Sequence, residues 1–320
     1  MGWDLGVDLG AYSCKVVLLG PDGPVGWLAV PSGTHYTRTA QEAVERLLAA
    51  NQLTLRSVRA VVATGIGAPQ IDFADSVVGD VICTARGTAA AAPSVRTVID
   101  IGSQATRVVW LDEVGRVAHF SSNEKCATGS GRFLQVIANV LRVRLEDVGA
   151  LSLQSTRPVT FTTGCAVFGE SEAITRVSEG VAREDILAGV HRALAEKIGS
   201  LVRTHGAKPE CAVSGGGALD VGLLRQLESH MGTSLRVLDR PQMVGALGAA
   251  VLASRLAEPG TDAASAAVQR RPARRAAAAE TRPRAVRLPP SPAREKAAEI
   301  RNERASRSGK AKPSPRGETP

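Results

Sequence analysis

Two segments of the chain repeat one pattern of an aspartate, a glycine and a cation. They are residues 6–25 and 98–117, displaced by 92 residues. In each, an apolar run ends in Asp-x-Gly, and a second apolar run follows a basic side chain. The repeat aligns Asp8 with Asp100, Gly10 with Gly102, and Lys15 with Arg107. A repeat of this length predicts a duplicated strand–turn–strand unit on two similar, facing domains.

These turns have the composition of a phosphate site. Glycine lets backbone N–H groups approach phosphate oxygens, because it carries no Cβ. An aspartate at the end of a strand can hold Mg²⁺ through waters or polarise an attacking water. Two such turns would grip a polyphosphate from both sides, with Lys15 and Arg107 adding positive charge. We therefore expect a nucleotide phosphate clamp, with purely structural hairpins as the alternative.

A third glycine-rich segment, SGGGALD at 214–220, lies between a predicted strand and a predicted helix. Its glycines allow the close approach of a flat ligand such as adenosine. The Lys-Ser/Thr pair of a P-loop does not follow them. Taken alone, the segment is equally typical of an ordinary strand-to-helix turn; beside the two hairpins, adenosine binding is favoured.

Cys126 and Cys165 each stand just before a predicted helix. Helix N-termini stabilise negative charge, which favours a thiolate or an anionic metal–sulfur cluster. Two thiolates cannot close a four-cysteine site, but two chains related by a two-fold axis would supply four. This arrangement suggests one [4Fe–4S] cluster shared by a dimer, although spacing alone favours two small buried thiols. We expect Cys14, Cys83 and Cys211 to be core residues.

The elements around these residues alternate between strands and helices. Helical spacing predicts helices at 40–50, 131–142, 166–179, 185–204, 220–230 and 241–256. Buried strands are predicted at 58–65 and 210–214, each running into a glycine turn. The alternation indicates an α/β protein with two layered domains and a cleft between them.

Composition supports a folded region followed by a basic extension. Of the 320 residues, 44% are hydrophobic and 22% are charged, which is globular usage. Residues 258–320 hold 15 Lys/Arg and 7 Asp/Glu, so the whole net charge of +8 lies there. We therefore divide the chain into a first domain at 1–93, a second at 94–257 that carries Cys126 and Cys165, and a disordered tail at 258–320 rich in Ala, Pro and Arg.

The same observations exclude several classes of function. Residues 1–257 carry no net charge, which argues against a nucleic-acid-binding domain. We find no apolar run long enough to span a bilayer and no targeting signal at the N-terminus. We therefore expect a cytoplasmic protein that binds neither nucleic acid nor membrane.

The order of motifs also resembles a known family. DLGAYSCK, ATGIG, VIDIGSQ, CATGSGRFL, GCAVFGESEAI, SGGGALDVG and VGALGAA are similar to motifs of the BadF/BadG/BcrA/BcrD ATPases. These are the 2-hydroxyacyl-CoA dehydratase activators and the benzoyl-CoA reductase ATPase subunits. The resemblance covers residues 3–256. It implies the duplicated actin-like, Hsp70-like and sugar-kinase-like (ribonuclease H-like) ATPase fold, with ATP and Mg²⁺ in the cleft.

The resemblance further implies a low-potential electron-transfer subunit. One [4Fe–4S] cluster would lie at a dimer interface, reduced ferredoxin or flavodoxin would load one electron, and acyl-CoA-reducing partner subunits would receive it. Catalytic roles are implied for Asp8, Asp100 and Gln104. Nucleotide contacts are implied for Gly10, Tyr12, Ser13, Lys15, Gly102, Ser103, Gly215, Gly216, Gly217 and Asp220. The implied cluster ligands are Cys126 and Cys165.

The second hairpin departs from the dehydratase activators. They carry Asp where this chain has Ala105, Lys where it has Arg107, and His where it has Thr84. These differences resemble the delta-type subunit of benzoyl-CoA reductase. The missing carboxylate predicts slow hydrolysis, so a homodimer and a heterodimer with a more active paralogous subunit both remain open. An iron-free small-molecule kinase and a non-catalytic ATP-binding regulator of the same fold are the alternative functions.

Overall fold

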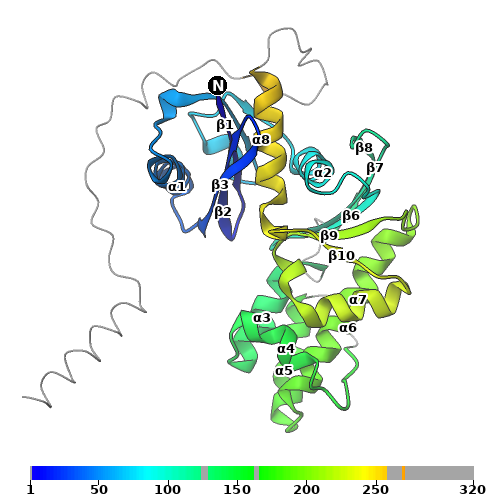
Figure 1. Cartoon of the computed structure of the whole chain (residues 1–320). Coiled ribbons are helices and arrows are strands. Elements are labelled where there is room, and N and C mark those ends of the chain that lie inside the picture. Colours follow the sequence, from blue (N-terminus) through cyan, green and yellow to red (C-terminus); the bar gives the residue numbers. More distant parts are fainter. Residues whose placement is uncertain (1, 124–128, 162–165, 258–268, 271–320) are drawn as a thin grey trace, which may run out of the picture. The chain divides into compact units, whose positions relative to one another are not determined.

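The computed structural model describes residues 2–123, 129–161, 166–257 and 269–270 (Figure 1). Contacts divide the chain into two compact units, 1–279 and 280–320, and all described residues lie in the first. The domain boundaries expected from sequence, at 93 and 257, remain a proposal. Cys126 and Cys165 lie outside the described residues.

Two sheets of similar topology form the framework of the first unit. The first sheet runs in the order β11 (Gln269–Arg270), β5 (Ser76–Val77), β4 (Val58–Thr64), β1 (Trp3–Leu9), β2 (Ser13–Gly20) and β3 (Gly23–Pro31). The second runs β10 (Arg236–Val237), β9 (Cys211–Ser214), β6 (Thr97–Ile101), β7 (Thr106–Leu111) and β8 (Val117–Ser122). In each, an antiparallel meander of three strands is extended by two strands parallel to its first member, and β11 adds an antiparallel edge strand to the first sheet.

The register of the hairpins confirms the sequence repeat. Asp8 pairs with Lys15 across β1 and β2, and Asp100 pairs with Arg107 across β6 and β7. The Gly10 N–H donates to the carbonyl of Ser13, just as that of Gly102 donates to Ala105. Because side chains alternate along a strand, equal register places each aspartate and its cation on the same face of its sheet.

Helices pack against the faces of both sheets. The helices are α1 (Tyr36–Ala50), α2 (Asp80–Ala91), α3 (Gly131–Leu141), α4 (Val148–Ser152), α5 (Ala166–Ser178), α6 (Arg183–Arg203), α7 (Val221–Met231) and α8 (Val244–Leu256). Short 3₁₀ turns lie at Leu55–Ser57, Ala68–Gln70, Leu145–Asp147, Gly216–Leu219 and Pro241–Met243. On the first sheet, Leu5 and Val7 pack into one core cluster with Val44 and Leu47 of α1. The second sheet builds its core with α3, α6 and α7.

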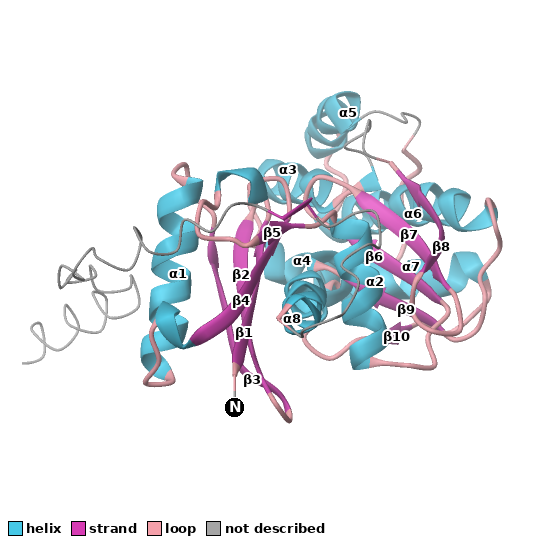
Figure 2. Cartoon of the chain, turned by 90° about the horizontal axis from the view of Figure 1, so that it is seen from above, coloured by secondary structure: helices cyan, strands magenta, loops and turns pink. Residues whose placement is uncertain are grey.

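Helices α2 and α8 lie between the two sheets (Figure 2). Although α8 follows the second sheet in the chain, it packs on β1, β4 and β2 of the first. Conversely, α2 follows the first sheet in the chain and contacts β6, β7 and β8 of the second. The two helices cross in close contact at Gly87 and Gly248, which carry no Cβ. A Cβ at Gly87 would clash with the Val244 carbonyl, and one at Gly248 with the Cys83 carbonyl. Each of these two helices therefore contacts the sheet that lies on the other side of the proposed boundary at 93.

The expected helices and strands are confirmed with boundaries shifted by a few residues. Helices α2 and α4 are additions to the sequence-based prediction. The sequence of α2, DVICTARGTAAA, is dominated by small residues and contains a glycine, so it shows little apolar periodicity. Strand β11 lies within the segment expected to be a disordered tail, where it pairs antiparallel with β5.

No helix in the described part of the chain is both long enough and apolar enough to cross a membrane.

Candidate functional site

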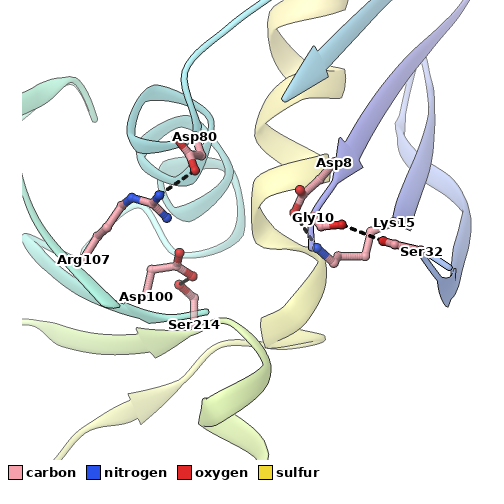
Figure 3. A network of polar contacts seen from close by, with 8 residues as sticks. All are labelled: Asp8, Gly10, Lys15, Ser32, Asp80, Asp100, Arg107 and Ser214. Atoms are coloured by element: carbon pink, nitrogen blue, oxygen red, sulfur yellow. Dashed lines mark hydrogen bonds and ion pairs between the residues drawn. The ribbon is translucent and has the colours of Figure 1, made fainter. Parts of the chain in front are cut away.

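The two hairpins face a common cavity of about 550 Å³ (Figure 3). Both hairpin turns line it, together with the end of β4, the start of α2, the glycine turn after β9 and the start of α8. A volume of this size is typical of small-molecule sites.

In the first hairpin, Lys15 and Asp8 form an ion pair, with 2.8 Å between Nζ and Oδ2. Both side chains are mostly buried. Glycines keep this pair accessible: a Cβ at Gly10 would lie 3.1 Å from the Lys15 Nζ, and one at Gly65 2.6 Å from the Asp8 Oδ1. Gly65 also has a φ of +87°, which favours glycine. The hairpin thus presents a cation and a carboxylate to the cavity, beside two residues without side chains.

In the second hairpin, the cation does not pair with the aspartate opposite it. Nη2 of Arg107 instead lies 2.8 Å from Oδ2 of Asp80, at the start of α2. The Asp100 carboxylate accepts a hydrogen bond of 2.9 Å from the Ser214 hydroxyl. Desolvation by the surrounding protein raises the pKa of Asp100 above its usual value of 3.8, against the opposing effects of Ser214 and Arg107.

Most of the residues predicted from sequence meet at this cavity. Its lining includes Asp8, Gly10, Tyr12, Ser13, Lys15, Asp100, Gly102, Ser103, Gln104, Gly215 and Gly216. Gly217 and Asp220 are not among the lining residues. Gly217 packs against the side chain of Ile101, and Asp220 caps α7 by accepting a hydrogen bond of 2.9 Å from the Leu223 N–H. The nucleotide roles of these residues stay proposals.

The cavity also contains residues that the sequence analysis did not place there. They are Ala11, Thr64, Gly65, Ile66, Asp80, Thr84, Pro241, Gln242 and Gly245, and the lining also includes Ala105 and Arg107 of the second hairpin. Asp80 follows Gly79 at the beginning of α2. A glycine before an acidic residue is a helix-start signal, but the weak periodicity of α2 obscured it. Gln242 comes from the 3₁₀ turn before α8, and only the return of that helix to the first sheet brings it here.

The three cysteines expected in the core are buried. Desolvation raises the pKa of Cys14 and Cys83 to about 12, and that of Cys211 to about 11. Their thiols are therefore protonated at neutral pH, in agreement with a role in the core.

The sequence profile of the BadF/BadG/BcrA/BcrD ATPase family matches residues 5–253. The chain belongs to this ATPase family. It is 36% identical to the 2-hydroxyisocaproyl-CoA dehydratase activator of Clostridioides difficile, over 78% of this chain and 94% of that protein. It is 34% identical to a benzoyl-CoA reductase subunit of Thauera aromatica, over 77% of this chain and 91% of that protein.

A solved structure supports the same assignment. The activator of the 2-hydroxyisocaproyl-CoA dehydratase from Clostridium difficile, with bound ADPNP, superimposes with a TM-score of 0.76 at 36% identity. The match covers 80% of this chain and 95% of that one. The fold is therefore the actin-like, sugar-kinase-like ATPase fold expected from the sequence. Similarity extends to both branches of the family, so the resemblance to the delta-type reductase subunit remains a proposal.

Proposed function

We propose that the chain is an ATP-dependent electron-transfer subunit that delivers low-potential electrons to an acyl-CoA-reducing partner. The observation that carries this proposal is the convergence of two equivalent Asp-x-Gly hairpins, each with a cation, on one cavity in a chain of this family. Relatives on both branches are named as dehydratase activators or as part of a reductase.

ATP fits the chemistry of this cavity. Lys15 and Arg107 would bind phosphate oxygens, and the turns at Gly10 and Gly102 would offer backbone N–H groups. The turn containing Gly215 and Gly216 would lie against the adenosine. Both hairpins would then contact the same polyphosphate, and their spacing would depend on whether the γ-phosphate is present.

Asp8 and Asp100 are the residues that we propose to hold Mg²⁺ and orient the lytic water, with Gln104 beside them. Among the residues that the structure describes, no group of three or more His, Cys, Asp and Glu side chains could hold a metal ion. Mg²⁺ is commonly held by one or two carboxylates together with substrate phosphates and waters, so two aspartates match its needs.

Cys126 and Cys165 are the proposed ligands of a [4Fe–4S] cluster, which when bound supplies a one-electron carrier. Four thiolates are needed, and each chain offers two besides its three buried cysteines, Cys14, Cys83 and Cys211. The donor set therefore fits only if a second subunit brings the other two, in a homodimer or with a paralogous ATPase subunit. Reduced ferredoxin or flavodoxin is the proposed electron donor.

The described helix after Cys126 is bonded directly to the second hairpin. The Gly131 N–H donates to the Gly102 carbonyl at 2.9 Å, and the Arg132 N–H donates to the Ser103 carbonyl at 2.8 Å. A displacement of this hairpin by the γ-phosphate would therefore be transmitted to the beginning of α3. This connection supports a coupling between the nucleotide and the proposed cluster.

The proposal is tested by replacing each cysteine with alanine in protein prepared without oxygen. Cys126→Ala and Cys165→Ala should each abolish iron binding and leave ATP affinity unchanged. Cys211→Ala, a buried thiol in β9, is the matched control and should retain iron. Iron retained by either ligand variant would refute the ligand assignment.

A non-catalytic ATP-binding regulator is the second candidate, and one observation favours it. Ala105 lines the cavity with only 6% of its surface exposed, at the position where dehydratase activators carry a carboxylate. Nucleotide binding without turnover, and no cluster after anaerobic reconstitution, would support the regulator. An iron-free protein that phosphorylates a small molecule would instead support the kinase.

A further inference from the structure

A buried network of three polar side chains lies beside the nucleotide cavity. His191 of α6 is fully buried, with its Nε2 3.0 Å from Oδ2 of Asp220 and its Nδ1 2.9 Å from Oγ of Ser152. An ionised carboxylate only accepts hydrogen bonds. Nε2 therefore carries the hydrogen and donates a hydrogen bond to the Asp220 carboxylate. The network joins α4, α6 and the start of α7, and α6 and α7 pack side by side (Figure 1).

The composition is that of a hydrolase triad, but the geometry is not. The Ser152 hydroxyl donates to the Gly149 carbonyl at 2.8 Å, and Ser152 has 6% of its surface exposed. None of the three residues lines the nucleotide cavity. A serine nucleophile must reach its substrate, so this network has another role.

Asp220 connects the network to the glycine turn of the cavity. Its backbone N–H donates to the Gly217 carbonyl at 3.2 Å and closes the turn. The other end of the turn is held by Gly215, whose N–H donates to the Pro241 carbonyl at 2.8 Å. Gly215 adopts a φ of +82°, so this turn is held in a conformation that few residues can adopt.

Two glycines outside the cavity make room for the network. A Cβ at Gly149 would lie 2.6 Å from the Asp220 Oδ1. A Cβ at Gly222 would lie 2.8 Å from the His191 Cε1 and would clash with the Ser152 hydroxyl. The absence of side chains at Gly149 and Gly222 thus leaves room for the contact of His191 with Asp220.

We propose that His191 is a positioning residue for nucleotide binding. Through its Nε2–H it holds the Asp220 carboxylate, and through Asp220 it fixes the turn of Gly215 and Gly216 in the shape that receives the adenosine. This inference rests on the proposed binding of ATP in the cavity. Without the Nε2 donor, Asp220 would be left with a half-satisfied buried carboxylate and would turn toward water, carrying the end of the glycine turn with it.

The test compares two amide replacements in the full-length chain. In His191→Gln the amide nitrogen reaches the place of Nε2, and in His191→Asn it reaches that of Nδ1. We expect the Kd for ATP to stay within about twofold in His191→Gln and to rise about tenfold in His191→Asn, a change of ~1.4 kcal/mol. The rate of hydrolysis at saturating ATP should be unchanged in both, because the two hairpins remain intact.

Leu194→Ala, which empties a fully buried site three residues further along α6, controls for general loss of stability. It should lower the melting temperature without changing the Kd for ATP. Equal affinities in His191→Asn and His191→Gln, or a loss in Leu194→Ala as large as that in His191→Asn, would overturn the inference. A wild-type chain that binds no ATP would overturn the proposed function as well.

Discussion

At the scale of single residues, the two hairpins have equivalent backbones and the same charges, but they differ in how those charges pair. Lys15 neutralises Asp8 within the first hairpin, whereas Arg107 of the second is paired with Asp80 of α2. Asp100 is left with a hydroxyl as its hydrogen-bond donor, and desolvation raises its pKa. A desolvated carboxylate raises the free energy of the ligand-free protein, and binding a cation would offset this cost.

Asp100→Asn should therefore stabilise the nucleotide-free protein at neutral pH and abolish ATP hydrolysis. Asparagine keeps an oxygen to accept from Ser214 and removes the charge. Because the pKa of Asp100 is raised on folding, the native state binds the extra proton, and its stability falls as pH rises above 3.8 towards the folded pKa. The advantage of the variant should be absent near pH 4 and grow with pH to a plateau, as melting curves would record.

The exposed Asp22→Asn is the matched control for this charge removal and should change neither quantity. A gain in stability of ~1 kcal/mol corresponds to about 2–4 °C in Tm for a chain of this size. An Asp100→Asn protein that melts at or below the wild-type temperature at pH 7, or that still hydrolyses ATP at the wild-type rate, would contradict this account of Asp100.

At the scale of elements, the second hairpin and α3 are joined by hydrogen bonds between their backbones. The first two N–H groups of α3 donate to carbonyls of that hairpin. Gly131 lies at this junction, where a Cβ would be 3.2 Å from the Gly102 carbonyl oxygen. The start of α3 and the turn of the second hairpin thus approach closely at a residue that has no side chain.

Gly131→Ala should separate nucleotide binding from its effect on the partner. We expect the Kd for ATP to change less than about threefold, within the ~1 kcal/mol that one strained contact costs. ATP-dependent electron transfer to the partner should fall at least tenfold. Asn139→Ala, at an exposed position of the same helix, serves as the control. Equal transfer rates in Gly131→Ala and wild type would disprove coupling through this junction.

The crossing of α2 and α8 is the other critical contact between elements. Gly248→Ala would place a methyl group against the Cys83 carbonyl, with no room for it. We expect a loss of about 1–3 kcal/mol in the free energy of unfolding, as for other overpacked cores. At Gly79, just before α2, nothing lies within 4 Å of an added Cβ, so Gly79→Ala should cost much less. Similar denaturant midpoints for the two variants would show that the helices adjust freely.

The sequence predicted the elements that local patterns determine. It did not predict contacts between elements far apart in the chain. The repeat predicted both hairpins and their register, because alternation and turn chemistry act within a few residues. The packing of α8 on the first sheet depends on Gly6, and its crossing with α2 depends on Gly248; neither glycine gives a periodic signal. Asp80 enters the cavity from the start of α2. The sequence predicts a ligand contact for Asp220. Its hydrogen-bond partner His191 lies 29 residues away in the chain, so only the folded structure shows that they meet.

At the scale of the whole molecule, the segment that carries the net charge also contributes a strand to the first sheet. The net charge of +8 lies in residues 258–320, while residues 1–257 are neutral. Two residues of the basic segment, Gln269 and Arg270, nevertheless pair with β5 at the edge of the first sheet. The edge strand is remote in sequence from both hairpins.

Truncation should separate the contribution of β11 from that of the residues beyond it. A chain ending at residue 257 loses β11, and one ending at residue 279 keeps it. We expect both to hydrolyse ATP at the wild-type rate, and only the shorter to lose stability, by ~1 kcal/mol for so short a pairing. A shorter chain that no longer hydrolyses ATP would show that the segment after residue 257 belongs to the nucleotide site.

The central claim is that this ATPase carries an iron–sulfur cluster shared by two subunits. The most direct measurement is the iron and sulfide content of anaerobically purified protein, alone and with candidate partner subunits, with the EPR spectrum recorded after dithionite reduction. The account predicts about four irons per pair of subunits and the signal of a reduced [4Fe–4S] cluster. Protein that binds ATP but contains no iron under any of these conditions would contradict it.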